Sequence, residues 1–256
     1  MNKKLSAALL LAVSASFSVS AFAADRSGVT CADLPSFADL QAALAVAVPG
    51  ASAIGLPMWA TLVDSGGRVC AVAKLSGTDP WPGSRVISAQ KANTANSFST
   101  ENVALSTANL YALVQPGGSL YGLQHSNPVN TLVAYRGAAT SFGTATDPMV
   151  GLRIGGVNVF GGGLALYNTA NKAIGAIGVS GDTSCADHEI AWKLRTALVG
   201  KGTGNGLVAN KVPGGVTKTA GSTVKSDNID YTPGGAFSHV QCPVPGVVPA
   251  LGGLTN

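Results

Sequence analysis

The strongest pattern of apolar and polar positions in the chain lies in residues 160–198. Two runs of small and β-branched residues, one ending at Asn168 and one covering residues 173–179, flank a short polar turn. Such paired runs are typical of antiparallel strands. Gly181 breaks the second run, and apolar residues then recur near helical spacing. The pattern therefore predicts a β-hairpin followed by a helix.

A second hairpin is predicted nearer the N-terminus. Residues 58–64 and 68–74 are mostly apolar and flank a Ser-Gly-Gly turn, in which glycine tolerates the positive φ angles of a short connection. An amphipathic helix is predicted before it, over residues 36–48. A helix with a face of small residues is predicted after it, over residues 84–98.

The remaining segments carry weaker patterns. A further helix is predicted over residues 104–114. Residues 115–151 are rich in Gly, Pro, Asn and Ser, which predicts long loops with short elements at most. Residues 200–256 show no sustained period, so we expect a C-terminal extension and not a separate domain.

The N-terminus has the pattern of a secretory signal peptide. Lys3 and Lys4 precede a Ser-punctuated apolar run, and an Ala-Phe-Ala sequence ends at Ala23. We expect cleavage after Ala23, which leaves a mature chain from residue 24 in the periplasm or outside the cell. An uncleaved membrane anchor is the alternative, but it needs a longer apolar run. No second run in the sequence is long enough to span a bilayer.

Charge and composition narrow the classes of partner. Removal of residues 1–23 takes away two lysines and no acids, so the formal charge falls from 16 − 12 = +4 to 14 − 12 = +2. This balance gives no reason to expect a nucleic-acid partner. Only 11% of residues are charged and 33 are glycine, which favours a surface partly buried by self-association, as in a homo-oligomer.

Four cysteines remain in the mature chain: Cys31, Cys70, Cys185 and Cys242. An even number in an exported protein favours disulfides. Four cysteines allow three pairings, and we prefer Cys31 with Cys70 and Cys185 with Cys242. The first would fasten the entry segment to a strand and the second would fasten the extension to the last helix.

A zinc site is the alternative for the second cysteine pair. Cys185-x-x-His188 and His239-x-x-Cys242 are mirrored and together offer four ligands for tetrahedral zinc. About fifty residues separate the two pairs, more than compact zinc modules use. A disulfide is therefore the preferred interpretation, and it would still bring the two histidines close together.

Three motifs in order resemble the GlcG/HbpS family of haem-binding and haem-degradation-associated domains. They are VDSGG at residues 63–67, QKANTA at residues 90–95 and GAIGVSGD at residues 175–182, and the similarity covers about residues 36–199. The resemblance implies an α/β (α+β) fold, a profilin-like antiparallel sheet with helices packed on it, assembled into dimers or larger rings. Residues 115–159, the extension from residue 200 and the four cysteines depart from the family pattern.

The resemblance also implies a tetrapyrrole ligand, with haem as the possible cofactor. Haem iron requires an axial ligand such as His, Met, Tyr or Cys. His188 is our first choice, with His125 and His239 as the other candidates, although a lone histidine is commonly a surface or capping residue. Haem propionates would find partners among four further residues: Arg85, Lys91, Gly181 and Asp182, the last two at a helix N-terminus.

Two other classes of function stay open. One is an enzyme or enzyme accessory that acts on a small carboxylic acid bound at the same helix N-terminus. The other is a structural or interaction role for a disulfide-bonded oligomer. The sequence contains no Gly-x-Ser-x-Gly elbow and no phosphate-binding glycine loop, so we assign no catalytic residue and consider an enzyme the weaker hypothesis.

Overall fold

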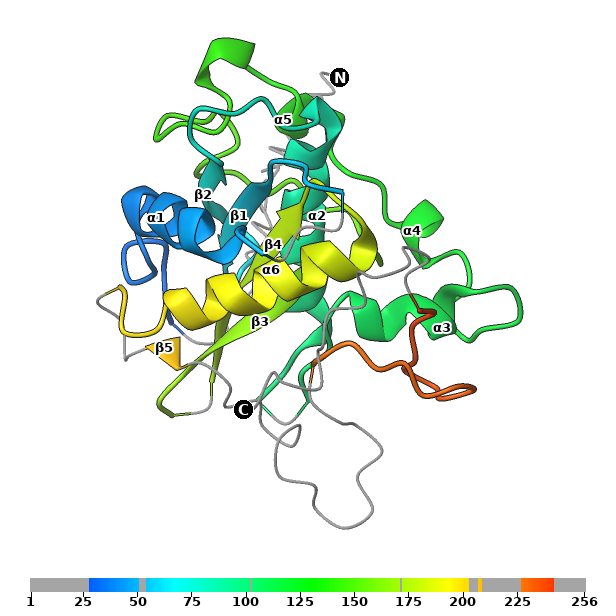
Figure 1. Ribbon diagram of the computed structural model, residues 1–256. Coiled ribbons are helices and arrows are strands. Elements are labelled where there is room, and N and C mark those ends of the chain that lie inside the picture. Colours follow the sequence, from blue (N-terminus) through cyan, green and yellow to red (C-terminus); the bar gives the residue numbers. More distant parts are fainter. Residues whose placement is uncertain are drawn as a thin grey trace, which may run out of the picture.

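The architecture is one antiparallel sheet between helices (Figure 1). The computed structural model describes residues 28–50, 54–101, 103–170, 172–202, 207–208 and 227–241. The sheet order is β2-β1-β4-β3-β5, and every neighbouring pair is antiparallel. The strands are β1 (Trp59–Asp64), β2 (Val69–Lys74), β3 (Gly163–Asn168), β4 (Ala173–Ser180) and β5 (Leu207–Val208). Both predicted hairpins are confirmed, and they share one sheet through β1 and β4.

Three long helices cover the two faces of the sheet. They are α1 (Phe37–Ala47), α2 (Pro82–Phe98) and α6 (Ser184–Ala197). The helices α1 and α6 pack with Leu62 and Ile177 on one face, whereas α2 packs with Val63 and Ala176 on the other. Successive residues of a strand point to opposite faces, so β1 is buried along its whole length.

Close packing of α2 on the sheet explains the glycines of the central strands. A Cβ placed at Gly178 would collide with the backbone of Ser88 in α2, and one at Gly163 would collide with the backbone of Lys91. The small residues of α2, such as Ala89 and Ala92, complete the contact. The glycines therefore permit helix and sheet to approach each other, and they do not form a phosphate cradle.

The segment between α2 and β3 consists of loops with short helices: η1 (Ala108–Leu110), α3 (Tyr111–Val114), α4 (Leu123–Ser126), α5 (Thr131–Ala134) and η2 (Ala139–Ser141). Loops were predicted from residue 115, but the single helix predicted over residues 104–114 forms only as η1 and α3. The Asn109 side chain accepts hydrogen bonds from the N–H and the hydroxyl of Ser106. Such local side-chain bonds compete with the helical backbone bonds.

One predicted disulfide joins the entry segment to the sheet. Cys31 is bonded to Cys70 of β2, which confirms this pairing. Cys185 is also disulfide-bonded, while Cys242, like residues 1–23, lies outside the described residues. Within the described ranges, none of the helices has the length and hydropathy needed to cross a membrane.

Candidate functional site

An open pocket lies where α3, α4 and the loop before β3 meet. Its walls include the aromatic residues Tyr111, Tyr121 and Phe160, and His125 also lines it. The cavity volume is about 240 Å³. His125 and Tyr121 are exposed, so the pocket presents an imidazole and aromatic rings to a ligand from solvent. We call it the His125 pocket.

A second pocket lies beside β1 and the N-terminal end of α2. It is lined by Trp59, Phe142 and Tyr135, with Arg85 among the lining residues, and its volume is about 310 Å³. The Trp59 indole N–H donates to the Trp81 carbonyl at 3.0 Å. This pocket, which we call the Trp59 pocket, contains aromatic rings but no histidine.

The Arg85 guanidinium is buried and engaged within the protein. It donates to both carboxylate oxygens of Asp147, at 2.8 and 2.5 Å, and to the Ala134 carbonyl at 2.8 Å. Its charge also lies 3.7 Å from the centre of the Phe142 ring. Asp147 neutralises the guanidinium, and the pair fastens the α5 segment to α2.

Lys91 is equally buried, and its partner is Asp187 of α6. The ammonium donates to the Asp187 carboxylate at 2.6 Å and to the Val179 carbonyl at 3.0 Å. Burial raises the pKa of Asp187 to about 6, against the opposing attraction of Lys91. Burial likewise lowers the pKa of Lys91. This pair joins α2 to the start of α6 at the C-terminal end of the central strand β4.

The carboxylates of Asp182 and Asp187 lie at the N-terminus of α6, where an anion was predicted to bind. Thr183 Oγ1 accepts from the Ala186 N–H at 3.3 Å, and Asp187 accepts from the Asp182 N–H at 2.9 Å. The Asp182 carboxylate in turn accepts from the Ile54 N–H at 2.9 Å. Gly181 is buried. The predicted anion position is thus surrounded by internal hydrogen bonds and negative charge.

His188 lies in the middle of α6 and is completely buried. Its Nε2 accepts from the Ile229 N–H at 3.1 Å, so the neutral ring carries its proton on Nδ1. That Nδ1–H has no hydrogen-bond partner among the described residues. Burial, together with the charge of Arg195, lowers the pKa of His188 to about 3. The imidazole is therefore neutral, and residues near Ile229 cover it.

His239 lies in the same C-terminal segment as Ile229, residues 227–241. Its Nε2 is hydrogen-bonded to Ser184 Oγ at 2.9 Å, and its Nδ1 donates to the Val240 carbonyl at 2.6 Å. The ring centres of His239 and Tyr111 are 4.6 Å apart. Because Tyr111 also lines the His125 pocket, His239 lies directly behind one wall of that pocket.

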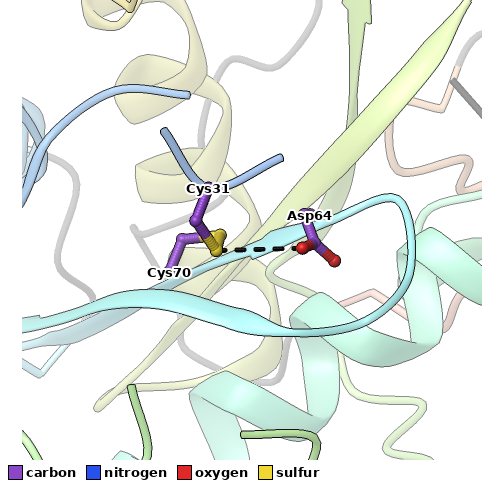
Figure 2. A group of neighbouring side chains, drawn as sticks. All are labelled: Cys31, Asp64 and Cys70. Atoms are coloured by element: carbon purple, nitrogen blue, oxygen red, sulfur yellow. Dashed lines mark hydrogen bonds between the residues drawn. A yellow bond between two sulfur atoms is a disulfide. The ribbon is translucent and has the colours of Figure 1, made fainter. Parts of the chain in front are cut away.

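One further group has the composition of a metal site (Figure 2). The ligand atoms of Cys31, Asp64 and Cys70 lie within 4.8 Å of one another. The two sulfurs are bonded to each other, so neither is a thiolate available to a metal. Asp64 instead accepts from the backbone N–H groups of Gly66 and Arg68 and thereby shapes the β1–β2 turn.

The structure separates the residues predicted to hold a ligand. Arg85 and Lys91 belong to two different buried ion pairs. His125 lines an open pocket. His188 lies beneath the segment of residues 227–241, and His239 belongs to that segment. Sequence reasoning missed Asp147 and Asp227, the partners of Arg85 and Arg195. Both aspartates lie in segments whose sequence has no periodicity. No pattern therefore pairs Asp147 with Arg85, 62 residues away, or Asp227 with Arg195, 32 residues away.

Comparison with known families gives one match. The model of the haem-degrading HbpS-like family matches residues 36–195 of the 256-residue chain. Comparison with curated proteins gives no significant match.

Comparison with solved structures gives several matches of low overall superposition. The PduOC:haem complex is 24% identical, with 65% of this chain and 94% of that chain covered and a TM-score of 0.44. The Klebsiella pneumoniae protein ORFY is 27% identical, with 64% and 89% covered and a TM-score of 0.43. HbpS is 19% identical, with 64% and 90% covered and a TM-score of 0.40.

Proposed function

The chain belongs to the haem-degrading HbpS-like family, and on this premise we propose that it is an exported protein that binds haem or a related tetrapyrrole. Family membership supports the class of ligand. The basic start, apolar run and Ala-x-Ala sequence at the N-terminus support export to the periplasm or beyond.

The observation that carries this proposal for the described residues is the composition of the His125 pocket. Imidazole and phenolate are both established ligands of haem iron, and the pocket contains His125, Tyr111 and Tyr121. Aromatic rings such as that of Phe160 favour contact with a flat macrocycle. Tyr121 is 68% exposed and Phe160 51% exposed, so both rings are accessible to a ligand from solvent.

In this proposal His125 would hold the iron of a bound haem, while the aromatic walls of the pocket would contact the macrocycle and exclude water from it. Bound haem supplies an iron centre whose reactivity depends on the axial ligand and on burial. The chemistry of the donors fits haem, but the space fits only part of it. The pocket volume of about 240 Å³ is below the range of about 300–1,000 Å³ of most small-molecule sites.

The small-acid hypothesis has less support from the geometry. Its anion position, the N-terminus of α6, is next to the carboxylates of Asp182 and Asp187, which would repel a second carboxylate. Arg85 and Lys91 are already neutralised by buried partners. Within the described residues, the His125 pocket therefore remains the better position for a ligand.

Titration of the purified protein with hemin tests the proposal. We expect a shifted Soret band at micromolar concentrations, and we expect His125→Ala to change the band and weaken binding by about tenfold or more, as for loss of a hot-spot contact. Tyr121→Ala should also weaken binding. Tyr135→Ala is the matched control, because Tyr135 is similarly exposed but lines the Trp59 pocket. Absence of any Soret shift with the wild-type protein would reject the function.

A further inference from the structure

Residues 227–241 of the extension lie beside α3 (Figure 1, orange), and hydrogen bonds join them to α6. We call this segment the strap. Its direction is opposite to that of α6, because contacts later in the strap involve residues earlier in the helix. The four paired contacts are Asp227 with Arg195, Ile229 with His188, Tyr231 with Cys185, and His239 with Ser184.

The strap is fastened mainly at its two ends. At one end, Arg195 donates to both oxygens of Asp227, at 2.5 and 3.0 Å, and all these groups are buried. At the other end, His239 is bonded to Ser184 and lies against the Tyr111 ring. Between the ends, the described contacts are single hydrogen bonds and a small apolar contact.

Cys185 is itself disulfide-bonded, and because Cys31 and Cys70 are bonded to each other, Cys242 is the one cysteine left in the sequence as its partner. The strap is therefore tethered covalently to the start of α6 at its His239 end.

That apolar contact is separate from the main core. Among the described residues, Ile229 packs in a small cluster with Ala108 and Cys185, and Tyr231 lies partly buried at its edge. Segments with few buried apolar contacts open at a lower free energy than the whole domain. The strap therefore has the properties of a segment that opens while the sheet and its helices stay folded.

The groups beneath the strap are unusual for a permanently closed interior. His188 is completely buried, but its Nδ1–H has no hydrogen-bond partner among the described residues. A buried donor without a partner costs free energy in the closed state, so a state in which water or a ligand accepts this bond is favoured by that amount. The bonds of the ring come from the strap itself: the Ile229 N–H donates to Nε2, and a hydrogen bond with the Asn228 side chain raises the pKa of the imidazole, against the larger effect of burial.

The strap also contacts the wall of the proposed ligand pocket. Tyr111 is the shared wall: it lines the His125 pocket and its ring contacts His239 of the strap. Withdrawal of the strap would therefore enlarge the pocket toward α6. This enlargement would supply the space that the pocket of about 240 Å³ lacks for a complete macrocycle.

We propose that the strap is a hinged cover of the tetrapyrrole site, which stays tethered to α6 at Cys185, and that its opening extends the His125 pocket toward α6 and exposes His188 to the ligand. This inference rests on the proposed function and adds its regulation. A cover reduces the apparent affinity by the fraction of molecules in the open state. Haem and the strap then compete for one groove, and each stabilises the state that excludes the other.

Ile229→Ala tests the cover, because it removes the apolar contact and leaves every strap hydrogen bond possible. Two measurements follow in the full-length protein: the rate at which diethyl pyrocarbonate modifies His188, read by peptide mass spectrometry, and the affinity for hemin. If the variant raises the open fraction tenfold, we expect His188 to react about tenfold faster and the apparent Kd for hemin to fall about tenfold. Val240→Ala is the matched control, because Val240 belongs to the strap but is 54% exposed.

A second variant shows whether His188 takes part in binding. His188→Gln combined with Ile229→Ala keeps an acceptor for the backbone but removes the imidazole. We expect it to lose the Soret position of the Ile229→Ala complex. Tyr231→Phe, which removes only the hydroxyl bonded to Cys185, replaces Ile229→Ala if that variant does not fold.

The outcomes separate the cover from the function itself. If the wild-type protein binds hemin and a loosened variant binds it with the same affinity, the strap is not a cover, and the proposed function is unaffected. Unchanged His188 reactivity in both loosened variants would overturn the cover as well, because the strap would then not open. Failure of every form to bind hemin would reject the function, and the cover of a haem site with it.

Discussion

Two segments outside the sheet are attached to it by the same device but with different support. The first segment, which runs from α5 to Asp147 and which we call the α5 segment, is attached through the ion pair of Asp147 with Arg85 of α2. The strap is attached through the ion pair of Asp227 with Arg195 of α6. Both pairs are buried and bidentate. In both, the guanidinium also lies against an aromatic ring, that of Phe142 in the first pair and Trp192 in the second.

The difference lies in what else each aspartate holds. Asp147 also accepts the backbone N–H groups of Gly143 and Met149, at 2.8 and 2.9 Å, so it closes its own loop. The described hydrogen bonds of the Asp227 carboxylate come only from Arg195, and Arg195 Nε has no partner among the described residues. A buried ion pair therefore holds a segment more firmly when its carboxylate also accepts backbone hydrogen bonds from that segment, as Asp147 does.

Asp147→Asn should have the largest effect. It leaves the Arg85 charge buried without a counter-charge and weakens the loop, so we expect a loss of about 3–5 kcal/mol in the free energy of unfolding. Urea unfolding followed by circular dichroism measures it. Asp79→Asn is the control, because Asp79 is exposed and should change stability by less than about 0.5 kcal/mol. A loss below about 1 kcal/mol at Asp147 would contradict the assigned role.

Asp227→Asn should have a smaller effect on the whole domain. Removal of a buried partner is costly only while the other charge stays buried, and an opened strap lets water reach Arg195. We expect a loss of about 1–2 kcal/mol in global stability, limited by the free energy of local opening. Hydrogen exchange should accelerate in residues 227–241 and not in β1 or β4. Equal losses for Asp147→Asn and Asp227→Asn would remove the distinction between the two attachments.

Acid should release the strap by way of His188. The pKa of His188 is lowered to about 3 in the folded protein and is 6.5 when unperturbed, so below pH 6.5 the opened state takes up a proton that the closed state refuses. The closed strap therefore loses stability as the pH falls from 6.5 toward 3, by up to about 1.4 kcal/mol per pH unit. The charged or titratable groups that act on this imidazole are Arg195, His239 and Lys91, and all lower its pKa.

The pH effect must be separated from that of Asp187. Burial raises the pKa of Asp187 to about 6, so this group favours the folded state as the pH falls from 6 to 3.8, which is the opposite sign. Hydrogen exchange of the strap as a function of pH reports the local opening alone. His188→Gln should abolish the pH dependence there while it retains an acceptor for the Ile229 N–H. A dependence that survives in this variant would assign the effect to another group.

The sequence predicted the parts of the fold that depend on local periodicity. Both hairpins and the helices α1, α2 and α6 follow from runs of β-branched and small residues, turn residues and helical spacing. The Cys31–Cys70 bond was the preferred one of three possible pairings, among which the sequence alone does not decide. The site could be predicted less well from the sequence, because its charged residues are neutralised by partners that lie far away along the chain. Lys91 was expected to meet a propionate, but it meets Asp187, 96 residues away. His188 is covered by a strap whose sequence has no period, so its burial left no pattern to detect.

Phe142→Leu should have the smallest effect and shows how much the ring adds to the stronger attachment. The Arg85 charge lies 3.7 Å from the centre of the Phe142 ring, and a leucine keeps an apolar contact but removes the negative face of the ring. We expect a loss of about 1 kcal/mol in the free energy of unfolding, with an unchanged urea m-value and unchanged exchange in the strap. A loss as large as that of Asp147→Asn would mean that the ring, and not the closed loop, makes this attachment permanent. The Trp192 ring, 4.7 Å from the Arg195 charge, would then be expected to hold the strap as firmly.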